Sequence, residues 1–156
     1  MRLHLVAIGQ RVPAWVRDGY ADYARRMPRE CQLELHVLNP GRGGRKTAAS
    51  VLRAQESRAL MDRVPPGAGV VALDERGVAW STQQLADRLS HWLGSGRDMA
   101  LLVGGANGLD DTCRAVAEHI WSLSALTLPH AMVRIVVAEQ LYRAWTLLKG
   151  HPYHRQ

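Results

Sequence analysis

The strongest constraint on the fold of this 156-residue chain is the alternation of two hydrophobic patterns along it. Short apolar runs typical of strands stand at 3–9, 32–38, 70–74 and 99–105. Apolar residues recur at helical spacing in 14–27, 48–63, 111–122 and 133–149, and a capping box of Ser81 and Gln84 opens another helix. Alternating strands and helices predict an α/β fold, with a mostly parallel sheet and helices on both faces.

Length and charge limit the class of protein further. A chain of 156 residues favours one domain, 1–156. Its net charge of +6, from 20 basic and 14 acidic residues, favours a polyanionic partner, most often nucleic acid. No apolar run approaches the roughly 20 residues that span a bilayer, and the N-terminus lacks a signal-peptide cleavage site. We therefore expect a cytoplasmic protein without a membrane partner, in which Cys31 and Cys113 are idle thiols.

Local motifs exclude several kinds of site. Seven histidines are scattered without H-x-x-x-H or H-E-x-x-H spacing, so we predict no metal site. The segment GRGGRKT, 41–47, resembles a phosphate loop, but Lys46 stands where the second glycine is required. We interpret it as a flexible basic loop, with contact to RNA phosphates as the functional option.

Ligands of parallel α/β sheets gather beyond the carboxyl ends of the strands. This rule indicates 73–75 after the third strand and GGANG, 104–108, after the fourth. The glycines of GGANG permit positive φ and close approach of a ligand to the backbone. Their spacing does not match the dinucleotide fingerprint G-x-G-x-x-G, and a glycine-rich turn alone is more often a turn than a site.

Two further segments are unusual for their positions. The loop within SLSALTLPHAMVR, 122–134, is too apolar for solvent, so we expect it to be held in the interior or against a ligand, with 126–128 as a possible fifth strand. The last six residues, HPYHRQ, concentrate side chains capable of chemistry at a terminus, where chains usually fray. Glu139 and Arg143 lie four apart on the last helix, a spacing that more often indicates a local ion pair than catalysis.

Three segments in order, LLVGGANGL, WSLSALTLPHAMVRIVVAEQLYRAW and HPYHR, closely resemble the ribosomal RNA large subunit methyltransferase H family. This is a family of small SPOUT (α/β-knot) methyltransferases. LVAIG near the start and LDERGVAWSTQQLA in the middle extend the resemblance over essentially the whole chain. Ala106 and Asn107 depart from the Pro-Glu that related sequences often have in the glycine turn, which puts the side-chain contacts of the turn in doubt.

The resemblance implies a deep C-terminal trefoil knot whose loops bind S-adenosylmethionine. It implies an apolar slot for adenine, whose polar edge meets backbone groups and the hydroxyls of Ser124 and Thr127. The cofactor-binding residues that we infer from it are Leu73, Gly104, Leu123, Ser124, Ala125, Leu126, Thr127 and Leu128. The implied reaction transfers the cofactor's methyl group to N3 of a pseudouridine in large-subunit ribosomal RNA, without a metal.

The resemblance also implies a homodimer. We expect Tyr153, His154 and Arg155 to form the acceptor site, with Glu139 and Arg143 shaping it, although a tail that only binds phosphate is the simpler alternative. Helix 134–149 is apolar around much of its circumference, which predicts that it contributes to the dimer contact. Two other functions stay open: a non-catalytic ribosome-binding module, and a flavodoxin-like domain that binds a nucleotide.

Overall fold

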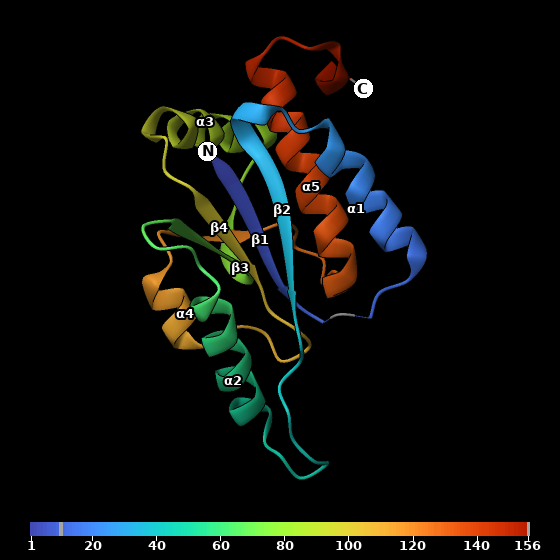
Figure 1. Ribbon diagram of the computed structural model, residues 1–156, viewed down its shortest axis with the longest axis vertical. Coiled ribbons are helices and arrows are strands. Elements are labelled where there is room, and N and C mark those ends of the chain that lie inside the picture. Colours follow the sequence, from blue (N-terminus) through green and yellow to red (C-terminus); the bar gives the residue numbers. More distant parts are fainter. Residues whose placement is uncertain (10, 156) are drawn as a thin grey trace.

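The computed structural model describes residues 1–9 and 11–155 and confirms the alternation of strands and helices (Figure 1). The elements are β1 (Arg2–Ile8), α1 (Ala14–Arg26), β2 (Gln32–Leu38), α2 (Ala49–Asp62), β3 (Gly69–Ala79), α3 (Thr82–Ser95), β4 (Met99–Val103), α4 (Asp111–Val116), β5 (His119–Ser122) and α5 (His130–Leu148). Two short 3-10 helices, η1 (Arg29–Cys31) and η2 (Pro152–Arg155), complete the described part. No helix in that part is long and apolar enough to cross a membrane.

The five described strands form one parallel sheet in the order β2-β1-β4-β3-β5. All carboxyl ends therefore lie at the same edge of the sheet. The flavodoxin-like order is 2-1-3-4-5, whereas here β4 lies between β1 and β3. The sheet order thus rules out the flavodoxin-like alternative.

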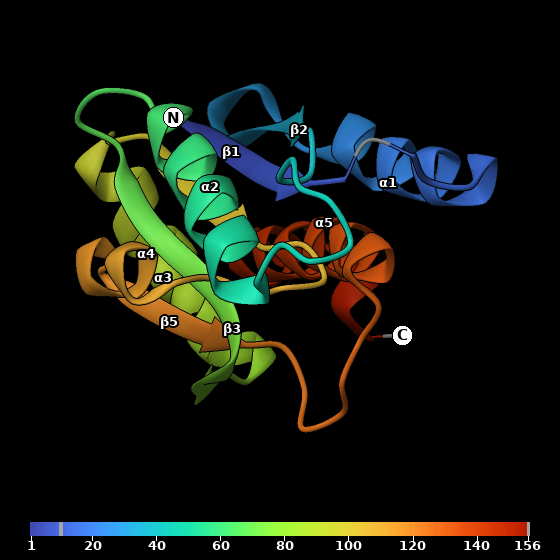
Figure 2. The same cartoon turned by 90° about the horizontal axis from the view of Figure 1, so that it is seen from below.

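Helices cover both faces of the sheet, as predicted (Figures 1 and 2). Successive residues of a strand point to opposite faces. In β1, Leu3 and Leu5 are buried in the core shared with α1, α3 and α5, while Val6 and Ile8 are buried in the core shared with α2 and α4. The continuous apolar character of β1 and β4 follows from this burial on both faces.

Element boundaries differ from the predictions near the C-terminal half. The predicted helix 111–122 is wrong beyond Val116, because Ala117 adopts an extended backbone and His119–Ser122 pair with β3 as an edge strand. The fifth strand is therefore 119–122, and 126–128 is a loop. β3 continues past the predicted end at 74 to Ala79, with irregular pairing between Leu73 and Val78. α5 begins at His130, three residues earlier than predicted.

α5 lies between α1 and α3 and packs on both. The approach to α1 is close: a Cβ on Gly19 would lie 3.1 Å from Cδ1 of Ile135. Val137 and Leu141 are fully buried, whereas Trp145 is half-buried. Contacts within one chain thus cover much of the apolar circumference that predicted a dimer contact, and the homodimer remains a prediction.

Candidate active site

A cavity of about 690 Å³ opens at the carboxyl edge of the sheet. Three chain segments line it: 73–76 of β3, the glycine turn after β4, and the loop between β5 and α5. The lining includes seven of the predicted cofactor residues, namely Leu73, Gly104, Leu123, Ser124, Leu126, Thr127 and Leu128. Ala125 is exposed within the same loop and is not among the residues that line the cavity.

The glycine turn places backbone rather than side chains against this cavity. Gly108 donates its N–H to the carbonyl of Gly105 (3.0 Å) and has a positive φ of 74°. A Cβ on Gly104 would lie 2.7 Å from the carbonyl carbon of Gly108, which is closer than real Cβ contacts come. The turn therefore requires glycine at 104 and 108, and both residues line the cavity without a side chain.

The loop from 123 to 129 is a wall of the cavity and is not buried in the interior. Leu126 is 75% exposed, and Ala125 and Thr127 are exposed too. Of the two alternatives expected for this loop, burial in the interior is therefore wrong for the chain alone, because the cavity that the loop borders is open to solvent; contact with a ligand stays a prediction. Ser124 stiffens the loop: its Oγ accepts the N–H of Leu126 (2.9 Å), and its carbonyl accepts the Ser122 hydroxyl (3.2 Å).

Asp74 and Arg114 tie two walls of the cavity together. The buried Asp74 carboxylate accepts hydrogen bonds from the N–H of Arg76 (2.9 Å) and from Nη1 of Arg114 (3.1 Å). Nη1 of Arg114 also donates to the carbonyl of Leu109, 2.7 Å away at the end of the glycine turn. Burial alone would raise the pKa of Asp74, but the hydrogen bonds from Arg76 and Arg114 outweigh burial and lower it. Asp74 is therefore a carboxylate at neutral pH.

The structure brings Glu139, Arg143 and Tyr153 together, as the predicted acceptor site requires. Oε1 of Glu139 accepts hydrogen bonds from Nε of Arg143 (2.8 Å) and from the hydroxyl of Tyr153 (3.1 Å). The Arg143 guanidinium lies over the Tyr153 ring, 5.1 Å from its centroid. Burial, a hydrogen bond with Tyr23 and the charge of Glu139 raise the pKa of Tyr153 far above its usual range. Tyr153 therefore stays protonated at physiological pH.

The other two tail residues differ in environment. Nδ1 of His154 is shielded from solvent and has no hydrogen-bond partner in the part of the chain that the structure describes. Arg155 is exposed. Gln156, the last residue, lies outside the described residues.

The tail lies near the C-terminal end of α5 (Figure 1), whereas the cavity is lined by the first turn of the helix. His130 and Val133, in the first turn of α5, line the cavity, whereas η2 packs against the later part of the helix. Glu139, which accepts the Tyr153 hydroxyl, follows Val133 by six residues, which corresponds to about 9 Å along the helix axis. No residue of 153–155 lines the cavity of its own chain.

The family model described as "Predicted SPOUT methyltransferase" matches residues 1–154. The chain belongs to this SPOUT methyltransferase family. It is 51% identical over 156 residues to the ribosomal RNA large subunit methyltransferase H of Thioalkalivibrio sulfidiphilus, with all of both chains covered. It is 52% identical over 155 residues to the protein of the same name from Methylococcus capsulatus, which covers 99% of this chain and 100% of that one.

Solved structures of methylases share the fold of this SPOUT methyltransferase. A methylase family protein from Neisseria gonorrhoeae superposes with a TM-score of 0.55 at 13% identity, covering 90% of this chain and 81% of the other. TrmJ from Z. mobilis gives a TM-score of 0.52 at 17% identity, with 92% and 70% covered. Together with the family match, these structures confirm the predicted α/β fold of a SPOUT methyltransferase, and the trefoil knot stays a prediction.

Arg134 also positions the wall of the cavity, and its role could not be predicted from the sequence. Arg134 of α5 is 2% exposed, and its Nη2 donates to the carbonyls of Ile8, at 3.2 Å, and of Gly9. Arg134 thus fastens the start of α5, which lines the cavity, to the carboxyl end of β1. Burial lowers its pKa. The only signal in the sequence is a basic residue within the apolar run VRIVV, which by itself does not indicate what the residue contacts.

Proposed function

We propose that this chain transfers the methyl group of S-adenosylmethionine to N3 of a pseudouridine in large-subunit ribosomal RNA. The observation that carries the proposal is the match to named ribosomal RNA large subunit methyltransferases at 51–52% identity over whole chains. The net charge of +6 agrees with an RNA substrate. We place the reaction in the cytoplasm, with ribosomes.

The cavity fits the cofactor that this family implies. Its volume of about 690 Å³ falls within the range of small-molecule sites, and it lies at the carboxyl edge of a parallel sheet. Leu73, Leu123 and Leu128 would supply apolar walls, and the Gly104 turn would supply backbone hydrogen bonds. The loops after β4 and β5 border one cavity, as a trefoil knot at this place would require. When bound, S-adenosylmethionine supplies a methyl group already activated on a sulfonium sulfur.

The acceptor nitrogen carries a proton that must leave before its lone pair can attack. Holding N3 in line with the methyl group lowers the barrier by several kcal/mol, and a base contributes roughly 10²–10⁴ in rate. Nδ1 of His154 is our candidate to accept this proton, because it is shielded and unpartnered among the described residues. Tyr153 stays protonated and stacks or donates instead, held by Glu139 and Arg143.

A second copy of the chain would complete the site. No residue of 153–155 lines the cavity of its own chain, and Glu139, which binds Tyr153, lies about 9 Å along α5 from Val133 in the cavity wall. We therefore propose a homodimer in which the tail of each chain, 153–155, lies over the cavity of the other. Half-buried apolar residues of α5, such as Val136 and Leu148, are candidates for the contact between the two chains.

The loop between β2 and α2 extends the basic surface beside the cavity. Arg42, Arg45 and Lys46 are exposed on this loop, and Arg53 at the start of α2 lines the cavity. Hydrogen bonds anchor the base of the loop: the N–H of Gly41 donates to Glu56 Oε1 (2.9 Å). We propose that this loop contacts phosphates of the ribosomal RNA.

Calorimetric titration with S-adenosylhomocysteine tests the cofactor assignment. We expect binding of one molecule per chain. A protein that binds large ribosomal subunits but shows no heat with this ligand would instead be the non-catalytic ribosome-binding module. Substitution of Leu126 by Ser should weaken the binding, since Leu126 is a large, mostly exposed apolar side chain on the cavity wall.

A further inference from the structure

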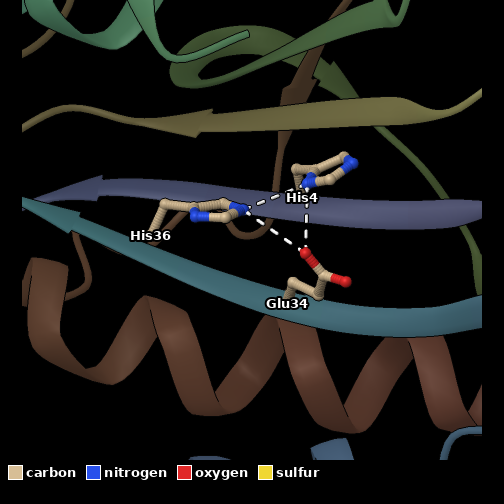
Figure 3. Close-up of side chains that lie close together, drawn as sticks. All are labelled: His4, Glu34 and His36. Carbon is tan, nitrogen blue, oxygen red and sulfur yellow. Dashed lines mark hydrogen bonds and ion pairs between the residues drawn. The ribbon is translucent and has the colours of Figure 1, made fainter. Parts of the chain in front are cut away.

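Three side chains with metal-binding atoms meet at the end of the sheet away from the cavity. Figure 3 shows His4 on β1 and Glu34 and His36 on β2, with their polar atoms turned toward one another. His4 is paired with Glu34 in the sheet register, and His36 follows two residues later on the same face of β2. The distances are 3.0 Å between His4 Nδ1 and His36 Nε2, 3.7 Å from His4 Nδ1 to Glu34 Oε2, and 3.8 Å from His36 Nε2 to the same oxygen.

These distances match the ligand triangle of a tetrahedral zinc ion. Zinc binds imidazole nitrogen and carboxylate oxygen at about 2.0–2.2 Å, which places neighbouring tetrahedral ligand atoms about 3.4 Å apart. The observed distances lie on either side of this value. Shifts of a few tenths of an ångström would therefore bring the three atoms around one ion, with two histidines and one glutamate as ligands.

The surroundings of His4 resemble those of a metal ligand held by an outer carboxylate. His4 is only 5% exposed, and its second nitrogen, Nε2, lies 3.3 Å from Oδ2 of Asp98. Asp98 is fixed by the N–H of Arg2, which donates to its Oδ1 (2.8 Å). A carboxylate that accepts the N–H of a ligating histidine sets its tautomer and increases its basicity. A hydrogen bond from Nε2 to Asp98 thus favours the tautomer of His4 in which Nδ1 is the acceptor that a metal can use.

The side of the site formed by Glu34 and His36 is accessible to solvent. The side chains of His36 and Glu34 are 19% and 38% exposed, so an ion can enter and keep a water ligand. Two cations border the cluster: Arg2, 3.5 Å from Glu34 Oε1, and Arg63, whose Nη2 lies 3.1 Å from His36 Nδ1. By donating to Nδ1, Arg63 favours a proton on Nε2, the atom that would bind the metal. The Arg63 side chain is exposed, so it can move into solvent when a metal ion binds. Arg63 therefore weakens metal binding without blocking the site.

We propose that His4, Glu34 and His36 bind a divalent transition-metal ion, with zinc as the best fit. The ion would join the edge strand β2 to β1 and would stabilise the fold without entering methyl transfer, because the cavity lies at the opposite edge of the sheet. This proposal departs from the sequence-based expectation of no metal site, which the zinc titration tests. Histidines 32 residues apart give no motif spacing and meet only through the register of two parallel strands.

The test uses full-length protein without a histidine tag, stripped of metal and titrated with zinc chloride. We expect one zinc ion per chain and a melting temperature raised by roughly 5–10 °C at one hundred times the dissociation constant. His36→Gln and Glu34→Gln should each weaken binding more than tenfold. Both residues are partly exposed, so these variants should keep the melting temperature of the metal-free protein. Asp98→Asn should weaken binding about 10–100-fold through His4.

Two further variants make the test specific. His91→Gln removes an exposed histidine outside the cluster and should leave zinc affinity unchanged. Arg63→Gln removes the competing donor and should tighten binding. Cobalt(II), used as a spectroscopic probe, should give the visible absorption of four-coordinate cobalt in wild type but not in His36→Gln. Absence of zinc binding by the wild type, or binding that His36→Gln and Glu34→Gln leave unchanged, would overturn the proposal.

Discussion

Gly104 is the position at which the proposed cofactor site should tolerate a side chain least. A Cβ there would lie 2.7 Å from the backbone of Gly108, so even alanine must displace the turn that borders the cavity. We expect Gly104→Ala to weaken S-adenosylhomocysteine binding at least tenfold, and Gly104→Val to abolish it, with circular dichroism largely preserved. Calorimetry measures the affinities.

Gly94→Ala is the matched control, because a Cβ on Gly94 of α3 meets no atom within 4 Å. It should leave cofactor affinity unchanged and increase stability by up to about 1 kcal/mol, since alanine favours a helix. Equal affinities of Gly104→Ala and wild type would remove Gly104 from the site.

Asp74 should make stability depend on pH in acid. Its pKa is lowered in the folded chain, so its contribution is fully present above its unfolded pKa of about 3.9 and is lost as pH falls through the folded value. We expect Asp74→Asn to reduce the free energy of unfolding by about 1–3 kcal/mol at pH 7, because Arg114 loses a charged acceptor. Urea unfolding should show this difference shrinking below about pH 4. A difference that is constant down to about pH 2.5 would contradict the assignment.

Among the elements, the C-terminal tail should be needed for methyl transfer but not for cofactor binding. Deleting 153–156 removes Tyr153, His154, Arg155 and the undescribed Gln156, but no residue that lines the cavity. We expect methyl transfer to be lost while S-adenosylhomocysteine affinity stays within about twofold of wild type. Single-turnover assays on ribosomes, at saturating enzyme, measure the maximal rate.

If the tail only binds phosphate, saturating RNA or low salt will restore much of the rate. His154→Gln and Arg155→Gln divide the two roles within the tail. The first should lower the maximal rate, and the second should mainly weaken RNA binding. A full maximal rate from the truncated protein would rule out a catalytic tail.

Elements that a run of apolar residues or a capping motif marks in the sequence could be predicted. Elements that form only by pairing with a strand far away in the sequence could not. β1 and β4 are buried on both faces, so their apolar runs identified them, and the capping box of Ser81 and Gln84 is present as expected. β5 was mistaken for helix because its four residues become a strand only by pairing with the edge of β3.

The same limit applies to the site. The rule for parallel sheets located the loops that line the cavity, since it depends only on where strands end. Arg114 joins Asp74 of β3 to Leu109 at the end of the glycine turn, and Arg134 joins the start of α5 to the end of β1. No local spacing in the sequence reveals either contact. The tail cluster of Glu139, Arg143 and Tyr153 was approached through family resemblance, and only its i,i+4 ion pair follows from spacing.

At the scale of the whole molecule, the distance between tail and cavity predicts that the active unit is a dimer. Sedimentation should show a dimer at micromolar concentration. Mixing Gly104→Val, which keeps its tail, with the chain truncated after 152, which keeps its cavity, should restore activity through mixed dimers. About a quarter of the wild-type rate is expected after random exchange of equal amounts, because half of the dimers are mixed and each mixed dimer has one intact site. If the mixture of the two variants stays inactive although their subunits have exchanged, a site shared between chains is contradicted.

Methylation of N3 of a pseudouridine in large-subunit ribosomal RNA is the activity that we propose for this SPOUT methyltransferase. The most direct measurement incubates the protein and S-adenosylmethionine with free ribosomal RNA, large subunits or assembled ribosomes that lack the modification, and then identifies the nucleosides by mass spectrometry. We predict N3-methylated pseudouridine, approaching one per large-subunit RNA, in at least one of the three substrates and not with Gly104→Val. Binding to these substrates without methylation of any of them would contradict the proposed methyl transfer.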